Sequence, residues 1–222
     1  QNNSNMTLSL TTMGTSNFKL NNNCTLTADA SLLSGVLATD SNESSSGNVV
    51  ITELCSTLNA DLSGITTTSV VAQFSKDRTF TGSLGKAVIN VINNKIMTLS
   101  DTVVIGTASF EITSGSTLVG PAYVLTGVSV SGDGTTNVQF LANTLDADLS
   151  NINTNTVYSD FDTNGTFTGK LGKAFVNISS DMVLDDTSIL NTAILNLLGN
   201  DDSVTLNATL YNTANTVISG KG

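Results

Sequence analysis

The sequence predicts an all-β protein, a β-sandwich built from a duplicated unit and carrying one short helix. Val, Ile and Leu alternate with Ser, Thr and Asn over many short stretches, which is typical of strands with one buried face. Gly, Asn and Ser separate these stretches, and long segments of the chain resemble each other. Many short strands of this kind favour a sandwich or a barrel, and we expect one continuous sandwich.

The duplication is carried by two pairs of motifs. TLNADLS at residues 57–63 recurs as TLDADLS at 144–150, and TFTGSLGKA at 79–87 recurs as TFTGKLGKA at 166–174. Both pairs share one offset, since 144 − 57 and 166 − 79 are both 87. At the end of the second motif, in GKAVINV at 85–91, the apolar residues Ala87, Ile89 and Val91 alternate with the residues between them, as in a strand.

The duplication also sets the expected domain boundaries. Residues 23–222 form the expected β-sandwich head, with related halves at about 36–120 and 121–220. Residues 1–22 have no counterpart in either half, so we expect them to form a separate N-terminal tail.

That tail contains an amphipathic strand, NMTLSLTTM, at residues 5–13. Met6, Leu8 and Leu10 alternate with polar residues, and Met13 closes the stretch. The strand has a complete apolar face, and it pairs either within its own sheet or with another molecule.

One segment, residues 187–198, is predicted to be helical. Its apolar residues recur at helical spacing, Asp186 or Thr187 precedes them as a possible cap, and Gly199 follows as a stop signal.

Composition and charge exclude several classes of partner. The net charge is −10 with eight Lys and Arg, so we expect no nucleic-acid partner. No apolar run approaches the ~18 residues that a membrane helix needs, so we expect no membrane insertion. The sequence starts at Gln1, which we interpret as the result of signal-peptide removal, and we therefore expect an extracellular protein.

The sequence offers little for catalysis or metal binding. It contains no His, which excludes Ser/His/Asp and Cys/His nucleophile systems. We therefore expect no enzyme activity, no cofactor and no metal site. Asp146 and Asp148 would share a strand face, which suits acid–base work on a glycan but suits a solvated edge better. Asp160, Asp162 and Asn164 resemble the opening of a calcium loop without its closing Glu, and we favour a hairpin turn.

Two covalent features are expected of an exported chain. Cys24 and Cys55 are its only cysteines and form either a disulfide, which we favour, or two buried thiols. N-glycosylation sequons would supply the surface polarity that charge does not. They lie at Asn2, Asn5, Asn23, Asn42, Asn164, Asn177 and Asn207.

An acidic chain rich in Ser, Thr and Asn, with many sequons and an amphipathic N-terminal strand, resembles the archaeal thread filament subunit, a donor-strand-complemented, type-1-pilin-like surface protein. The resemblance implies an Ig-like, pilin-like sandwich that lacks one strand. The N-terminal strand of the neighbouring subunit would fill this groove with Met6, Leu8, Leu10 and Met13. It also implies a head-to-tail homopolymer that carries N-glycans and serves adhesion or biofilm formation.

Three alternatives remain open. The first is a monomeric secreted or cell-surface adhesion module, for example one associated with an S-layer, whose residues 5–13 pair within their own sheet. The second is a secreted glycosidase. In the third, the C-terminal segment from Val204 to Val217 is the donor strand.

Overall fold

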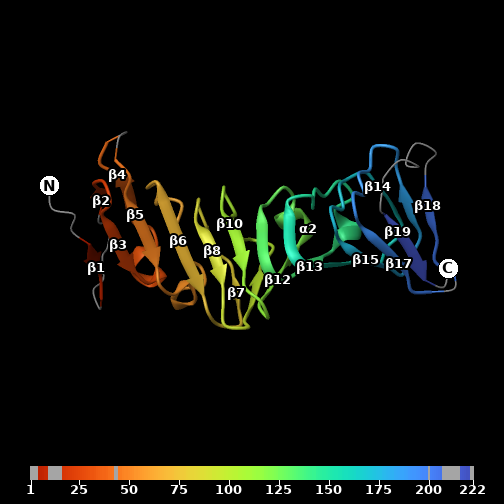
Figure 1. The fold of residues 1–222 in the computed structure, drawn as a ribbon, viewed down its shortest axis with the longest axis horizontal. Helices are drawn as coiled ribbons and strands as arrows, with labels where there is room; N and C mark the ends of the chain where they lie inside the picture. Colours follow the sequence, from red (N-terminus) through yellow and green to blue (C-terminus); the bar gives the residue numbers. More distant parts are fainter. Residues whose placement is uncertain (1–4, 10–16, 43–44, 200, 207–215, 221–222) are drawn as a thin grey trace. The chain divides into compact units, whose positions relative to one another are not determined.

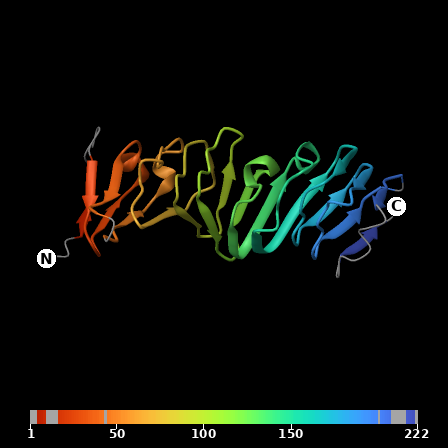
Figure 2. The same ribbon diagram turned by 90° about the horizontal axis from the view of Figure 1, so that it is seen from above.

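The strands form a parallel β-solenoid of about ten turns. The computed structural model describes residues 5–9, 17–42, 45–199, 201–206 and 216–220. The chain divides into two compact units, residues 1–116 and 117–222. Figures 1 and 2 show that strands of successive turns, such as β5, β6, β8 and β10, lie side by side. The predicted Ig-like, pilin-like β-sandwich is therefore wrong.

Unit 1 consists of short strands and two single-turn helical segments. In chain order they are β1 (Met6–Thr7), β2 (Asn17–Leu20), β3 (Thr25–Ala28), α1 (Ala30–Leu33), β4 (Leu37–Asp40), β5 (Asn48–Ile51), the 3-10 turn η1 (Leu54–Ser56), β6 (Ser69–Phe74), β7 (Arg78–Phe80), β8 (Val88–Val91), β9 (Ile96–Leu99) and β10 (Ser109–Ile112).

Unit 2 has the same construction. Its elements are β11 (Thr117–Pro121), α2 (Ala122–Leu125), β12 (Val130–Gln139), the 3-10 turn η2 (Leu141–Asn143), β13 (Ile152–Phe161), β14 (Gly165–Phe167), β15 (Phe175–Ile178), β16 (Met182–Leu184), β17 (Ile194–Leu197), β18 (Val204–Leu206) and β19 (Val217–Gly220). None of the described helices is long and apolar enough to span a membrane.

Each described strand pairs in parallel with a strand one turn away, as β5 does with β3 on one side and with β6 on the other. Residues at one register position therefore stack in a column through successive turns. One core-facing column of unit 1 runs through Ala28, Ile51, Ala72, Ile89 and Phe110, each at most 1% exposed. Such columns form the hydrophobic core and bury the face that the alternation predicted.

A recurring corner turn connects the strands. A Leu or Ile carbonyl accepts a hydrogen bond of 2.9 to 3.2 Å from the backbone N–H three residues later, which defines a β-turn. The pairs are Leu33/Val36, Leu62/Ile65, Leu84/Ala87, Ile105/Ala108, Leu125/Val128, Leu149/Ile152, Leu171/Ala174 and Leu190/Ala193.

The duplicated segments occupy equivalent elements in the two units. β7 and β14, β8 and β15, and η1 and η2 are each separated by the offset of 87 found in the sequence. Gly85 and Gly172 are both the second residue of a corner turn, with φ of +61° at each. Because strands and corner turns coincide at this offset, it corresponds to a whole number of turns.

The sandwich was predicted because alternation of apolar and polar residues reports only that one face is buried. It does not report whether the neighbouring strand is antiparallel or parallel, or how far away it lies in the sequence. In this chain the buried faces of the strands point into the interior of the solenoid and pack against one another.

The predicted helix at 187–198 is also wrong. Residues 194–197 form strand β17, and Leu190 and Ala193 belong to a corner turn. The buried apolar residues are therefore 190, 193, 195 and 197. The first two are three residues apart because of the turn, and the rest are two residues apart because of the strand. The three-residue step imitates helical spacing.

Candidate functional site

The N-terminal strand pairs with its own chain. Met6 and Thr7 of β1 lie opposite Leu26 and Thr27 of β3, and the Leu8 N–H donates to the Thr27 carbonyl at 2.8 Å. Leu10 and Met13 lie outside the described residues. The Met6 side chain, at a core-facing position, is 50% exposed.

The predicted disulfide is absent, because Cys24 and Cys55 are both free thiols. Cys24 precedes β3, whereas Cys55 follows its register partner β5, so the two residues lie at opposite ends of neighbouring parallel strands. Four strand residues span about 13 Å, and a disulfide tolerates a Cα separation of at most about 7 Å.

The sequons differ in their surroundings. Asn23 and Asn42 are exposed, and Asn2 and Asn207 lie outside the described residues. Asn42 accepts a hydrogen bond from Ser45 Oγ at 3.0 Å. Asn5 and Asn164 are also exposed, and each uses its side-chain oxygen to accept a backbone N–H, from Thr25 at 3.2 Å and Asp181 at 2.9 Å.

Asn177 differs from those sequons because it is half-buried and bonded on both sides. Its amide donates to Asp160 Oδ1 at 3.1 Å, and its oxygen accepts from Asn196 Nδ2 at 3.0 Å.

Two of the three candidate calcium residues are used in these structural bonds. Asp160 accepts from Asn177, and Asn164 anchors the next turn through Asp181. The predicted hairpin turn there is wrong, because β13 and β14 on either side of it pair in parallel with β15 and β16 and not with each other. Among the described residues, no group of three or more His, Cys, Asp and Glu side chains is placed to hold a metal ion.

The acid pair in the second TLxADLS motif is not arranged as a catalytic dyad. Asp146 is exposed, whereas Asp148 forms a 2.6 Å ion pair with Lys170 of the next turn and accepts from the Ser150 hydroxyl and N–H. Burial raises the pKa of Asp148, but the bonds from Lys170 and Ser150 outweigh it and leave the pKa below its usual value. Asp61, its counterpart, has its pKa lowered by hydrogen bonds from Ser63.

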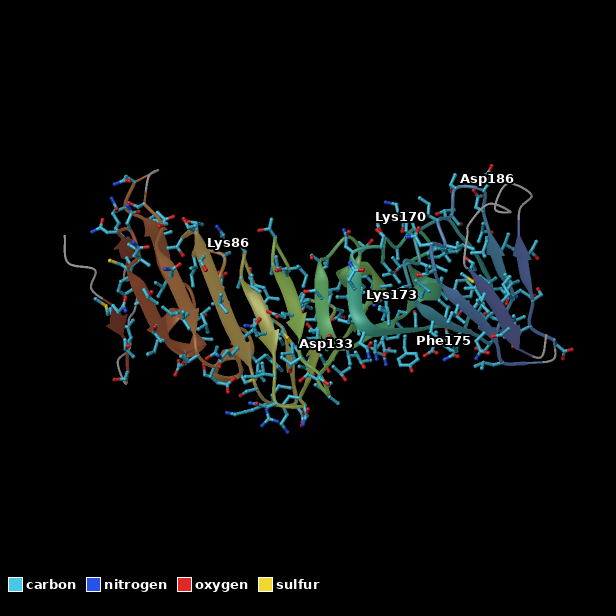
Figure 3. The ribbon with its side chains drawn as sticks, in the orientation of Figure 1. Lys86, Asp133, Lys170, Lys173, Phe175 and Asp186 are labelled. Carbon is cyan, nitrogen blue, oxygen red and sulfur yellow. The ribbon has the colours of Figure 1, made fainter. Side chains whose placement is uncertain are left out.

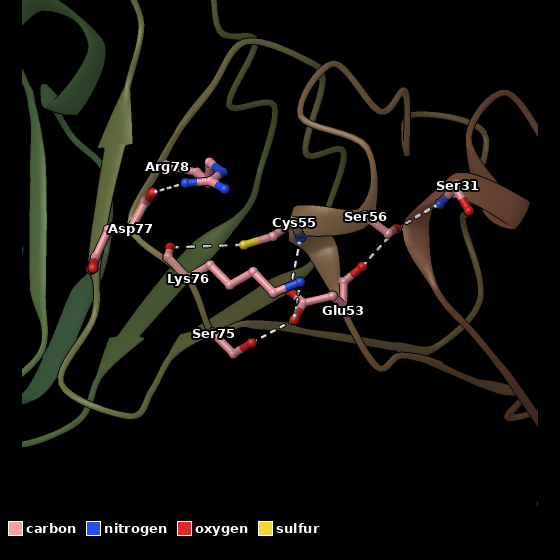
Figure 4. Close-up of polar contacts among 8 residues, drawn as sticks. All are labelled: Ser31, Glu53, Cys55, Ser56, Ser75, Lys76, Asp77 and Arg78. Carbon is pink, nitrogen blue, oxygen red and sulfur yellow. Dashed lines mark hydrogen bonds and ion pairs between the residues drawn. The ribbon is translucent and has the colours of Figure 1, made fainter.

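A denser polar cluster lies at the η1 corner of unit 1 (Figure 4). Glu53 accepts from Ser75 Oγ and from the Cys55 N–H, and Lys76 lies 4.0 Å away. Burial raises the pKa of Glu53, but these partners reverse the shift and lower it. Burial and the neighbouring Glu53 raise the pKa of Cys55 to about 11, so this thiol is a poor nucleophile. Through Glu53 the cluster caps the corner at η1.

The outer sheet face of unit 2 carries two parallel rows of side chains. The apolar row contains Tyr158, Phe175, Ile194 and Val217 in register, and Phe175 is labelled in Figure 3. The amide row lies two residues further along the same strands and contains Asp160, Asn177, Asn196 and Ser219. Together these eight residues are called the strip.

The core-facing column is open at Ile218. Ile218 pairs with Leu195, which is fully buried, yet Ile218 itself is 45% exposed. A hollow of about 270 Å³ lies beside it, lined by Leu197, Val204, Ile218, Ser219 and Gly220. Met6 of unit 1 and Ile218 of unit 2 are thus both core-facing and both half exposed, although they belong to different columns: Met6 extends the column of Leu26, and Ile218 extends that of Leu195. We call these surfaces the Met6 end and the Ile218 end.

Sequence reasoning missed the strip and the Ile218 end. A usable signal was present, because LGKAVINV at 84–91, LGKAFVNI at 171–178 and LNTAILNL at 190–197 share one pattern. That pattern aligns Asn177 with Asn196 in a column, where the structure bonds them.

Comparison with known proteins gave no match: no family model, curated protein or solved structure resembles this chain.

Proposed function

We propose that this chain is a non-catalytic structural subunit that assembles head to tail by stacking the Ile218 end of one copy on the Met6 end of the next. One observation carries the proposal. At each end, a side chain in a core-facing column is half exposed, although other members of the columns are buried.

The two ends have complementary geometry for such a contact. Every described strand pairing is parallel, so β1 of a second copy can continue the sheet beyond β19 in the same direction. Met6 of the second copy would then stack on Ile218, as Ile218 stacks on Leu195. Burying two such side chains contributes about 1.5–3 kcal/mol each, before strand hydrogen bonds and ordering costs are counted.

A contact between two different ends of identical copies is heterologous, and it generates filaments when the rotation from copy to copy does not close a ring. This mechanism differs from strand donation, because no strand leaves its own solenoid. It also covers sheet edges that would otherwise invite irregular association.

The test places a charge in the contact. Ile218→Glu buries an unpaired carboxylate in the stack, so filaments seen by electron microscopy and sedimentation should disappear. Val104→Glu is the matched control, since Val104 is 58% exposed and lies at an outward position of unit 1. Wild type and the Val104 variant should both form filaments.

A mixing experiment identifies the partner surfaces. Met6→Glu blocks one end and Ile218→Glu the other, so each variant alone should stay monomeric. An equimolar mixture retains one intact pair of ends and should form dimers that grow no further. Filaments from either variant, or a monomeric wild type, would refute the proposal. Circular dichroism of both variants establishes that they are folded.

A further inference from the structure

The strip on unit 2 combines two kinds of surface at a fixed spacing. Its apolar row is accessible, with Tyr158 and Val217 exposed by 45% and 50% and Phe175 half-buried between neighbours. Tyr158 and Phe175 pack edge to face with ring centroids 5.9 Å apart, which fixes both rings. The amide row lies about 7 Å away, the rise of two strand residues.

Hydrogen bonds hold the amide row in one orientation. Asn196 donates to Asn177, and Asn177 donates to Asp160, at 3.0 and 3.1 Å. Each amide nitrogen carries two hydrogens, so one bond leaves a second donor on each Asn. The row thus offers aligned polar groups, repeated at the strand spacing of about 4.8 Å.

The location of the strip selects against a peptide ligand. Extended peptides are bound mainly at sheet edges, where free backbone groups pair with them, whereas the strip occupies a sheet face. Its backbone groups already pair with neighbouring strands. Recognition there must use side-chain amides and apolar surfaces.

The charge of the chain further restricts the class of ligand that the strip can bind. The eight residues contain one carboxylate, Asp160, and no cation, and the whole chain has a net charge of −10. An anionic polymer would be repelled by this field. An uncharged polymer that repeats hydroxyl groups beside apolar ring faces matches both rows.

We infer that the strip binds an extended, uncharged polysaccharide, with sugar rings against Tyr158 and Phe175 and hydroxyl groups on the amide row. This inference is independent of the proposed assembly, because it uses outward-facing side chains of β13, β15, β17 and β19, whereas the assembly uses the core-facing Met6 and Ile218.

Affinity electrophoresis supplies the test, with hydroxyethyl-cellulose and galactomannan as uncharged probes and carboxymethyl-cellulose as an anionic one. The wild type should be retarded by at least one uncharged polymer and not by the anionic one. The double variant Tyr158→Ser/Phe175→Ser should bind at least tenfold more weakly. The matched control is Val71→Ser/Val88→Ser, which changes the equivalent positions of unit 1 and should bind like wild type.

A second variant protects the test against misfolding of the first. Asn196→Ala shortens the amide row without touching the aromatic pair, and it should weaken binding severalfold. No retardation of wild type by either uncharged polymer would overturn the inference. So would equal losses in the unit 2 and unit 1 double variants, or stronger retardation by carboxymethyl-cellulose.

Discussion

The same column of the outer sheet is built differently in the two units. In unit 2, Asp160, Asn177 and Asn196 form a hydrogen-bonded row. Their counterpart in unit 1 is Gln73, Asn90 and Glu111, in the same register, but the buried Asn90 oxygen has no hydrogen-bond partner. Asn90 and Asn177 are separated by the offset of the duplication. The same residue type at the same position of the fold is therefore hydrogen-bonded on both sides in unit 2, whereas its oxygen has no partner in unit 1.

The η1 and η2 corners show the same divergence. Glu53 caps η1 through its carboxylate, whereas Phe140, its counterpart at η2, has φ of +58°, makes no side-chain cap and is 54% exposed. Corner turns and core columns are alike in the two units, while outward positions differ. Packing inside the solenoid therefore determines which residues occupy inward positions, whereas outward positions are free to carry function.

The largest effect is expected at the shared glycines. Gly172→Ala should destabilise the chain by at least about 2 kcal/mol, because φ is +61° and the new Cβ would lie 2.7 Å from the Leu149 carbonyl oxygen. Its twin Gly85→Ala should cost as much, with 2.6 Å to the Leu62 oxygen. Gly127→Ala, at φ +71° with open space around it, should cost about 1 kcal/mol. Urea unfolding measures all three, and equal costs at Gly172 and Gly127 would contradict the close approach.

Smaller changes in stability are expected at the equivalent asparagines, and the two variants should differ in sign. Asn177→Val leaves Asp160 and Asn196 without their partner and should cost about 1–2 kcal/mol. Asn90→Val removes an unsatisfied buried oxygen and adds a β-branched side chain, so it should be neutral or stabilising by up to about 1 kcal/mol. The two variants are compared by their urea midpoints. If Asn90→Val is the more damaging, the two columns do not differ as described.

The smallest effect concerns Asp148 and Asp61. Asp61 lies opposite Ser83, so Lys170→Ser gives Asp148 the same neighbour that Asp61 has. The variant should lower the free energy of unfolding by about 0.5 kcal/mol, because the Lys170–Asp148 ion pair is partly exposed to solvent. The cost should vanish in about 0.5 M salt, as expected of a screened ion pair. A cost that persists at high salt would point to packing by the lysine stem instead.

Both carboxyls also predict acid sensitivity. Their pKa values are lowered in the folded chain, so their contribution is complete above the unfolded value of about 4 and is lost as the pH falls through the folded value. The urea midpoint of wild type should therefore drop between about pH 5 and pH 3. Asp61→Asn should flatten that dependence, and an unchanged profile would exclude Asp61 as a contributor.

Strand positions were predictable from the sequence, but strand partners were not. Alternation around Ala87, Ile89 and Val91 correctly placed a half-buried strand, which is β8. Its partners β6 and β10 lie one turn earlier and one turn later in the chain, and nothing in local alternation encodes that separation. The duplication is visible because whole motifs recur in it. The single turn is harder to see, because successive turns share little beyond the corner Leu and a small or branched residue three positions later.

The candidate site was less predictable than the fold. Tyr158 and Phe175 belong to different strands, and only the pairing of β13 with β15 brings them together. Sequon and cysteine patterns carried no information on their surroundings. The sequon at Asn177 therefore gave no sign of its bond to Asp160, and the two cysteines gave no sign of the distance between them.

Parallel pairing between adjacent turns also governs how the chain acquires its structure. The described strand pairings each join one turn to the next, so loop closure is short and its entropic cost changes little from one turn to another. Folding can then start at any stable turn and spread to its neighbours, with stability approximated by a sum of turn and interface terms. Contacts this local place the chain nearer to repeat proteins than to β-sandwiches in folding kinetics, since a sandwich must wait for distant strands to meet.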